Sequence, residues 1–463
     1  MKAEERLVAF VHDTRFADIP PAILKTVKHQ VLAVMGTTIA GATAEGCTTA
    51  VQFYRDLGGK SEATILVHGG KIPAQDAAFV NGVMARALDF CDSMAPGPHM
   101  GSSVIPAALA ASELAGRCSG RDFVASVAVG TEVAARLNLS EEAYDGFDPT
   151  GICVPFGAAA AAARILGLNE KESWNALALA FNSCGGSFQS HIDGSLGVRF
   201  VQGRVAHSGV MSARLASKGI TGPRNFLEGV YGYYHLYGKD MFSGEKTLSD
   251  LGSEYRLLNL VFKKYPSCAL TAGSTDVMLK LIAEEGLTAE DTERIDILVP
   301  PYTYKLVGHL FEIGDNPKVN AQFSIQYCVA NALLRKSSKL SHFEEDSIKD
   351  PRIATLTERI HVVEDKALEA RGHTPLDMRV VTRSGKEYLR AIDIAPGFPG
   401  NELTQEDHEQ RFWDCMDFAE KKIDRESAVR IVSLVDAIEK IEDVRMLIPL
   451  LLSDTDRSQR KEV

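Results

Sequence analysis

Six consecutive alanines, Ala158–Ala163, follow Pro155-Phe156-Gly157 in the middle of an apolar stretch. Alanine has the highest helix propensity of any residue, and its small side chain lets neighbouring helix backbones approach closely. The segments Ile105–Leu114 and Asp122–Leu137 also carry apolar or small residues on most of their faces, which is the pattern of a buried helix. Roughly the first 250 residues therefore predict a unit of closely packed α-helices.

The apolar pattern changes after Lys264, where short runs of β-branched residues appear between helices. We expect strands at 295–299 and 359–363, a hairpin of 378–382 and 388–394 around Ser384-Gly385, and helices at 288–293 and 324–334. From about Glu406 the pattern is helical again, and the tail 453–463 is expected to be frayed. These patterns predict a mainly α fold with an inserted α+β domain: residues 1–260 and 396–463 form a large helical domain from both chain ends, and residues 261–395 form the smaller domain.

The charge and cysteine content argue against several kinds of partner and location. The chain carries 50 basic and 61 acidic residues, a formal charge of −11, so long-range attraction of nucleic acid is not expected. No run of about 18 apolar residues lacks a charged or small polar break, and the N-terminus mixes acids with bases, so we expect neither a membrane span nor a signal peptide. The eight cysteines form no CxxC pair, which favours reduced thiols and a cytoplasmic location over disulfides or a zinc site.

Familiar motifs for nucleotide, metal and nucleophilic chemistry are missing. Gly59-Lys60-Ser61 resembles the end of a phosphate loop, but Tyr54 stands where its first glycine should be. No GxGxxG follows a predicted strand, and neither HExxH nor GxSxG occurs. No histidine pairing is typical of metal ligands. We therefore expect no metal and no cofactor, and either cofactor-free acid–base chemistry or a protein without catalysis.

Polar residues gather in one segment between two apolar stretches, Arg86–Ser103. The segment joins two predicted helices and holds Asp89 and His99. Capping by the two serines before the second helix, and a turn held by Asp92, would explain part of this pattern. Capping requires neither an acid inside the apolar face, as at Asp89, nor a histidine behind two prolines. Asp89 and His99 are therefore candidate functional residues.

This segment and several others resemble the MmgE/PrpD family. The matching motifs are, in order, Leu88-Asp89-Phe90 with the histidine and SSVIPAALA that follow, the alanine helix with Arg164-Ile165-Leu166-Gly167-Leu168, Asp193-Gly194, Gly203-Arg204-Val205-Ala206-His207-Ser208-Gly209, Gly219-Ile220-Thr221-Gly222-Pro223, 263–268 and 321–327. The family includes 2-methylcitrate dehydratases, cis-aconitate decarboxylases and an iminodisuccinate epimerase. The resemblance implies a large helical domain from both termini, a smaller lid domain, a homodimer, an active site between the domains, and proton transfer next to a carboxylate without a cofactor.

The resemblance also implies roles for single residues. Asp89 and His99 resemble active-site residues of the family, Ser93 resembles a neighbouring threonine position, Lys263 resembles a lysine at the start of the lid, and Tyr327 resembles a tyrosine that lines the site. For Lys263, the alternative is a solvated lysine beside Lys264. For Tyr327, which lies on an apolar helix, core packing with a satisfied hydroxyl is an equal alternative.

Other positions depart from the family pattern. The family often has His-Pro-Thr where this chain has Asp148-Pro149-Thr150, and its usual lysine and histidine are replaced by valines around Arg199. A histidine sometimes found after the lid lysine is Cys268 here. His191 could supply an imidazole from a different place, or be a surface residue. Asp148 could line the site, or cap the helix that begins at the next residue.

Together, these residues and the resemblance predict a cofactor-independent lyase that acts on a small carboxylic or polycarboxylic acid by α-proton abstraction, similar to 2-methylcitrate dehydratase. The predicted catalytic residues are Asp89, His99, Lys263 and Tyr327, and the predicted substrate-binding residues are Arg199, Ser93, Asp148 and Cys268. Two alternatives stay open: an epimerase or isomerase of a dicarboxylate, and a catalytically inactive carboxylate-binding protein. We expect a cytoplasmic homodimer with no nucleic-acid or membrane partner.

Overall fold

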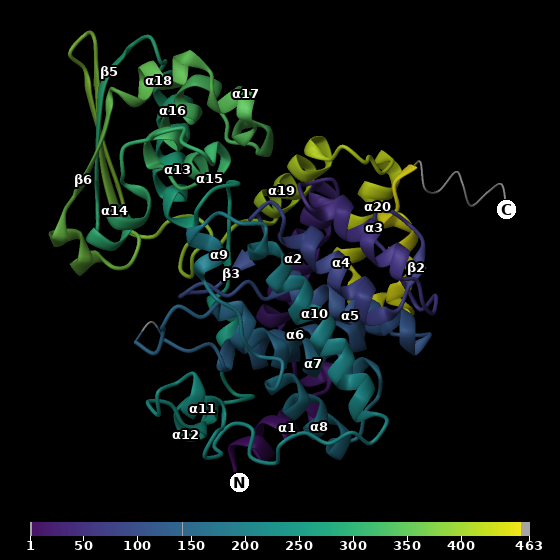
Figure 1. The fold of residues 1–463 in the computed structure, drawn as a ribbon. Helices are drawn as coiled ribbons and strands as arrows, with labels where there is room; N and C mark the ends of the chain where they lie inside the picture. The colour runs from purple at the N-terminus through teal and green to yellow at the C-terminus, as the bar shows by residue number, and fades with distance from the viewer. Residues whose placement is uncertain (1, 141, 455–463) are drawn as a thin grey trace. The chain divides into compact units, whose positions relative to one another are not determined.

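The computed structural model describes residues 2–140 and 142–454. The chain divides into two compact units, which we call the helical unit (Met1–Leu260 with Cys415–Val463) and the mixed unit (Val261–Asp414). The fold is mainly α-helical with a small mixed sheet, as the sequence predicts (Figure 1). Most of the tail that was expected to be frayed lies outside the described residues.

The mixed unit extends further along the chain than residue 395, where the sequence suggests that it ends. The N–H of Phe262 donates to the carbonyl of Gly397 (3.1 Å), and the Phe262 ring lies edge-on to the ring of His408, with centroids 4.9 Å apart. Both contacts tie the segment after the hairpin to the first residues of the mixed unit. Hydrophobic patterning predicts the helix that follows, α19 (Gln405–Phe418), but not the unit in which it begins.

The centre of the helical unit is built from long buried helices. They are α2 (Pro21–Gly41), α4 (Ala74–Arg86), α5 (Gly101–Ala115), α6 (Gly120–Arg136), α7 (Pro149–Ile165) and α10 (Gly197–Ala216). All alanines of Ala158–Ala163, in α7, are fully buried. A Cβ at Gly130 of α6 would lie 2.6 Å from the carbonyl oxygen of Gly157, and one at Gly209 of α10 would lie 2.5 Å from the Cβ of Ala158. The predicted close packing of helices is confirmed.

Both ends of the chain contribute to this unit. Its other helices are α1 (Ala3–Asp13), α3 (Cys47–Leu57), α8 (Glu170–Phe181), α9 (Gln189–Ile192), α11 (Tyr233–Leu236), α12 (Gly244–Leu248) and α20 (Arg425–Asp436). Its short strands are β1 (Ala63–Thr64), β2 (Lys71–Ile72) and β3 (Asp92–Ser93), and its 3₁₀ turns are Phe16–Asp18, Arg256–Asn259, Ile438–Lys440 and Val444–Leu451. The C-terminal α20 packs against α2. None of the helices in the described ranges combines the length and apolar character that crossing a membrane requires.

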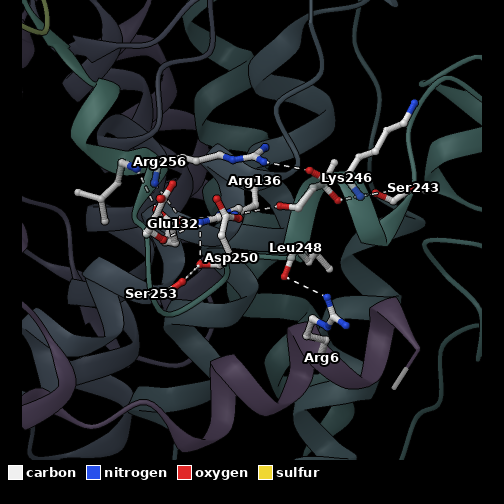
Figure 2. A network of polar contacts seen from close by, with 12 residues as sticks. Arg6, Glu132, Arg136, Ser243, Lys246, Leu248, Asp250, Ser253 and Arg256 are labelled. Atoms are coloured by element: carbon white, nitrogen blue, oxygen red, sulfur yellow. Dashed lines mark hydrogen bonds and ion pairs between the residues drawn. The ribbon is translucent and has the colours of Figure 1, made fainter.

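A buried ion pair ties α6 to the chain that follows α12 (Figure 2). Glu132 and Arg136, one turn apart on α6, are both fully buried, and Arg136 Nε donates to Glu132 Oε1 (2.6 Å). The further partners of the pair are the carbonyls of Thr247 (3.1 Å) and Glu254 (2.6 Å), the carboxylate of Asp250, and the N–H groups of Arg256 (3.1 Å) and Leu257 (2.9 Å). Two buried charges thus satisfy the backbone of a segment that has little regular structure of its own.

The mixed unit is built on a four-stranded sheet with strand order β6-β5-β7-β8. Figure 1 labels β5 and β6 of this sheet. The strands are β5 (Thr292–Val299), β6 (Ile360–Glu364), β7 (Leu376–Thr382) and β8 (Glu387–Ile392), and β4 (Val261–Phe262) lies outside this sheet. β5 and β6 are parallel, and β7 is antiparallel to both β5 and β8. The predicted strands and hairpin are confirmed. Gly385 in the hairpin turn has a φ of +82°, which glycine adopts without steric cost.

Helices cover the buried face of this sheet. Ile295, Ile297 and Val299 alternate along β5 and belong to the same core as residues of α13 (Ala272–Glu285) and α16 (Ile325–Arg335). The predicted helix at 324–334 is therefore confirmed as α16. The remaining helices are α14 (Pro301–Val307), α15 (Pro317–Gln322), α17 (Glu345–Ile348) and α18 (Pro351–Thr357), with 3₁₀ turns at Ala269–Thr271, Leu340–Phe343 and Lys366–Arg371.

The helix expected at 288–293 is wrong. The preceding helix, α13, ends at Glu285, because Gly286 adopts a left-handed conformation with φ +66°. Thr288 and Asp291 then close a local turn, in which the Asp291 N–H donates to Thr288 Oγ1 (3.2 Å) and Thr288 Oγ1 donates to Asp291 Oδ2 (2.6 Å). Threonine and aspartate side chains that bond to nearby backbone groups compete with helix formation. The residues that resemble a helix start therefore form a turn ahead of β5.

Candidate active site

The polar loop begins where α4 ends, at Arg86 and Asp89. Asp89 has a φ of +52°, a left-handed conformation that few residues other than glycine adopt. Its N–H donates to the carbonyl of Arg86 (3.1 Å), and its Oδ1 lies 2.7 Å from Arg86 Nη1. The Arg86 side chain is only 5% exposed and the Asp89 side chain 18%. The strained turn therefore presents a carboxylate directly to a buried guanidinium.

Asp92 fastens the same loop to two helices. It is fully buried, and its Oδ2 accepts hydrogen bonds from Gln30 Nε2 of α2 (3.0 Å) and from the N–H of Gly101 in α5 (3.0 Å). Gln30 is held in turn by Thr131 of α6 (3.2 Å). The expectation that Asp92 holds the turn is confirmed.

His99 completes the loop and faces Asp89. Its Nδ1 lies 2.8 Å from the carbonyl oxygen of Asp92, which can only accept, so Nδ1 carries a proton. Nε2 lies 3.8 Å from Asp89 Oδ1. In the neutral imidazole this nitrogen has the lone pair and can take up a proton. Cys91 Sγ also lies close to Nδ1, at 3.3 Å.

Buried polar groups of α7 and α10 position His99. The His99 N–H donates to Thr150 Oγ1 (3.0 Å), and Gln202 Nε2 donates to the same oxygen (3.2 Å). The hydroxyl of Ser103 donates to the carbonyl of Gln202 (3.0 Å). All four residues are less than 9% exposed. The loop, α5, α7 and α10 are therefore connected by hydrogen bonds around one imidazole.

Asp148 lies at the start of α7 and is only 1% exposed. Its Oδ1 accepts the N–H of Gly151 (3.2 Å), which confirms the helix-capping interpretation. Its Oδ2 accepts no hydrogen bond from the described residues and lies 4.0 Å from Nδ1 of His191. Burial raises the pKa of Asp148 above its usual value, although the Gly151 N–H and Arg86 act in the opposite direction.

Arg86 links the two carboxylates electrostatically. Burial opposes its charge, but Asp89, Cys91 and Asp148 together raise the pKa of its guanidinium above the usual value. The two acids therefore share one positive charge. Among the described residues, no group of three or more histidine, cysteine or acidic side chains is placed to hold a metal ion.

Two family models match the chain. The model of the MmgE/PrpD N-terminal domain matches residues 5–244, and that of the MmgE/PrpD C-terminal domain matches residues 265–437. The chain belongs to the MmgE/PrpD family. The resemblance seen in the sequence motifs is thereby confirmed.

The relatives of this MmgE/PrpD protein include two kinds of enzyme. It is 26% identical over 464 residues to a cis-aconitate decarboxylase of Homo sapiens, which covers 96% of this chain and 94% of the relative. It is 26% identical over 346 residues to a 2-methylcitrate dehydratase of Escherichia coli K12, which covers 69% of this chain and 70% of the relative. Decarboxylases and dehydratases are both lyases, which supports an enzyme of the lyase class.

The structure brings some of the predicted residues of this MmgE/PrpD protein together and leaves others in the mixed unit. Asp89 and His99 meet, Asp148 shares Arg86 with Asp89, and Ser93 is half-buried in β3 of the same loop. Arg199 lies on α10, where its Nη1 donates to the carbonyl of Glu45 (2.6 Å). Burial lowers the pKa of Arg199, and the nearby Arg86 lowers it further.

Lys263, Cys268 and Tyr327 belong to the mixed unit. Lys263 is only 5% exposed, so the alternative of a solvated lysine is wrong. Its neighbour Lys264 forms two ion pairs, with Nζ 2.9 Å from Asp276 Oδ1 and 3.4 Å from Asp407 Oδ1. Cys268 is half-buried beside the 3₁₀ turn that precedes α13.

Sequence reasoning missed Arg86, Thr150, Gln202 and the contact of Asp148 with His191. Arg86 could have been found, because it stands one helical turn before Asp89 and can pair with it. Thr150 is part of the motif already noted at Asp148. No local signal identifies Gln202, since its partners come from α5 and α7.

Substitution of Tyr327 tests whether this predicted catalytic residue takes part in the reaction. It is fully buried in the core of the mixed unit, packs between the rings of Phe311 and Phe343, and donates its hydroxyl proton to the carbonyl of His342. We expect Tyr327→Phe to lower the free energy of unfolding by about 1–3 kcal/mol, because a buried carbonyl loses its donor, and to leave turnover unchanged. Chemical denaturation and steady-state kinetics measure both. A large loss of turnover with unchanged stability would instead support a catalytic hydroxyl.

Proposed function

We propose that this protein is a lyase that removes a proton from the carbon next to a carboxylate of a small acid. The observation that carries the proposal is the buried cluster in which Asp89 Oδ1 lies 2.7 Å from Arg86 and 3.8 Å from His99. It combines a group able to accept a proton, a partner able to return one, and a fixed positive charge. The decarboxylase and dehydratases among its relatives support the same reaction class.

The proposed step begins at a C–H bond beside a carboxylate. His99 or Asp89 takes the proton, and the electron pair of that bond delocalises into the carboxylate as an enediolate. In dehydration the pair then forms a C=C bond as the C–O bond breaks, and a protonated group gives its proton to the leaving hydroxyl, so that water departs. In decarboxylation the C–C bond to a carboxylate breaks in place of the C–H bond, so no α-proton is removed. Carbon dioxide departs, a protonated group of the site gives its proton to the carbon that keeps the electron pair, and solvent water reprotonates that group.

Positive groups have to hold the charge that develops on the substrate. We assign this role to Arg199 and Lys263, with Ser93 and Cys268 as further substrate contacts. Arg86 is engaged with Asp89 and therefore serves the acid–base pair. Because a lysine and histidines of the family pattern are absent here, we expect weaker binding of a tricarboxylate than of a dicarboxylate.

Proton exchange with solvent tests the proposal. The purified protein is incubated in deuterium oxide with a panel of mono-, di- and tricarboxylic acids that includes cis-aconitate and 2-methylcitrate, and the α-carbon protons are followed by NMR. We expect at least one acid to lose an α-proton to solvent, with release of water or carbon dioxide identifying the type of lyase. Exchange without elimination would indicate an epimerase, and binding without exchange would indicate an inactive carboxylate-binding protein. Either result would overturn the proposal.

A homodimer and a cytoplasmic location are further proposals. The eight cysteines form no disulfide with one another, which supports the proposed location. The homodimer rests on the resemblance to the MmgE/PrpD family, because the small-residue helices of the helical unit are already covered within one chain.

A further inference from the structure

We infer that His191, oriented by Asp148, is a second acid–base group of this site. The inference rests on the proposed function and adds to it a pair of residues in which His191 transfers the proton and Asp148 positions the ring. The starting observation is the 4.0 Å separation between His191 Nδ1 and the oxygen of Asp148 that does not cap α7.

The imidazole of His191 is held in place by ring stacking and is partly exposed to solvent. Its ring stacks on that of Phe188, with centroids 4.1 Å apart and an interplanar angle of 8°, and Phe188 in turn packs edge-on against Tyr144. The His191 side chain is 24% exposed, whereas the Asp148 side chain is 2% exposed. A proton-transfer group needs this combination of a fixed ring and an open edge.

The backbone that positions Asp148 also positions the loop of His191. The Asp148 N–H donates to the carbonyl of Gly186 (3.0 Å), and the Gly185 N–H donates to the carbonyl of Gly151 (2.9 Å). Arg204 of α10 donates to the carbonyls of Ser183 (2.6 Å) and Gly185 in the same loop. The proximity of the carboxylate and the imidazole is therefore built into the packing of α7, α10 and this loop.

Burial raises the pKa of Asp148, and the positive charges around it act against that rise. Arg86 of α4 and Arg204 of α10 both stabilise the carboxylate, and the buried thiol of Cys153 in α7 is its other titratable neighbour. An anionic Asp148 in turn stabilises the imidazolium form of His191. Arg86 also binds Asp89, so the two acid–histidine pairs share one guanidinium.

This arrangement accounts for the aspartate at position 148. The resembling motif has a histidine there, and the present chain has a carboxylate that holds an imidazole from a neighbouring loop. In the proposed reaction, protonated His191 gives its proton to the leaving hydroxyl or to the carbanion, and the neutral ring is reprotonated by solvent water.

The test compares His191→Gln and Asp148→Asn with wild type over the pH range of activity. We expect His191→Gln to lower kcat by about 100-fold or more and to remove one limb of the pH profile. Asp148→Asn retains a good helix cap, so it should fold, lower kcat less, and move that limb to lower pH because the imidazolium loses its carboxylate. Wild-type kcat and an unchanged profile in His191→Gln would overturn the inference.

The matched control is His207→Gln. His207 on α10 also faces a carboxylate, Asp76, at 3.3 Å, but Asp76 lies in the first turn of α4, about 15 Å along the helix axis from Arg86. We expect no change of kcat or of the pH profile in this variant. NMR titration of the His191 ring gives a readout without turnover: its pKa should fall in Asp148→Asn, and an unmoved pKa would overturn the pairing. If wild type exchanges no proton on any acid of the panel, the proposed function fails separately from this result.

Discussion

His99→Gln is expected to lower kcat by about 100- to 10,000-fold, which is the usual contribution of a positioned general acid or base. The hydrogen bond from Nδ1 to the carbonyl of Asp92 leaves Nε2 as the proton acceptor toward Asp89. Glutamine can keep the hydrogen bond to that carbonyl, but its amide is not basic enough to accept a proton. Steady-state kinetics on an acid that exchanges in the deuterium experiment, or the exchange rate itself, measures the effect.

The control for this variant is His68→Gln. His68 is also buried and also hydrogen-bonded through its ring to a backbone carbonyl, that of Ala42 (2.9 Å). Both substitutions should therefore lower the free energy of unfolding by similar amounts, since each alters a buried imidazole bonded to the backbone. Only His99→Gln should lose turnover. If His99→Gln keeps activity within tenfold of wild type, His99 is not an acid–base group.

The close helix packing of the helical unit could be predicted from the sequence, because runs of small residues leave few choices. The alanines at 158–163 can be buried only if other helices approach closely, and the glycines on α6 and α10 allow that approach. The hairpin of the mixed unit was predictable for a related reason, since alternating apolar residues around Ser384-Gly385 specify both the strands and the turn. The end of the mixed unit was not predictable, because it depends on contacts of Phe262 with residues far along the chain.

The residues of the candidate site also divide into those that the sequence could predict and those that it could not. Asp89, Asp92 and His99 stand in one short loop, so an unusual density of polar residues between apolar helices was visible in the sequence. His191 and Gln202 reach the cluster through tertiary packing of α7, α10 and the intervening loop, and no local pattern encodes that proximity. Helix capping was one of two open interpretations of Asp148 beside substrate binding, and only the structure shows that its second oxygen faces an imidazole.

Glu132→Gln is expected to lower the free energy of unfolding of the helical unit by about 3 kcal/mol. The substitution leaves Arg136 charged and fully buried, and removing one partner of a buried pair typically costs about 3–5 kcal/mol. Asp250 continues to contact Arg136, so the lower end of that range applies here. The amide also has one acceptor oxygen where the carboxylate has two, so one of the N–H groups of Arg256 and Leu257 would face an NH2 donor. Figure 2 shows Arg256 beside Glu132. Equilibrium denaturation measures the loss.

Asp145→Asn provides the matched change at an exposed ion pair of the same unit. Asp145 lies 3.3 Å from Lys239, and their side chains are 77% and 47% exposed, so removing the charge should cost less than about 1 kcal/mol. Equal losses in the two variants would mean that burial adds nothing to the Glu132 pair. Adding Arg136→Met to Glu132→Gln should not restore stability, although neutralising a buried pair often does. The carbonyls of Thr247 and Glu254 would then lose their donor, and that cost replaces the cost of the unpaired charge.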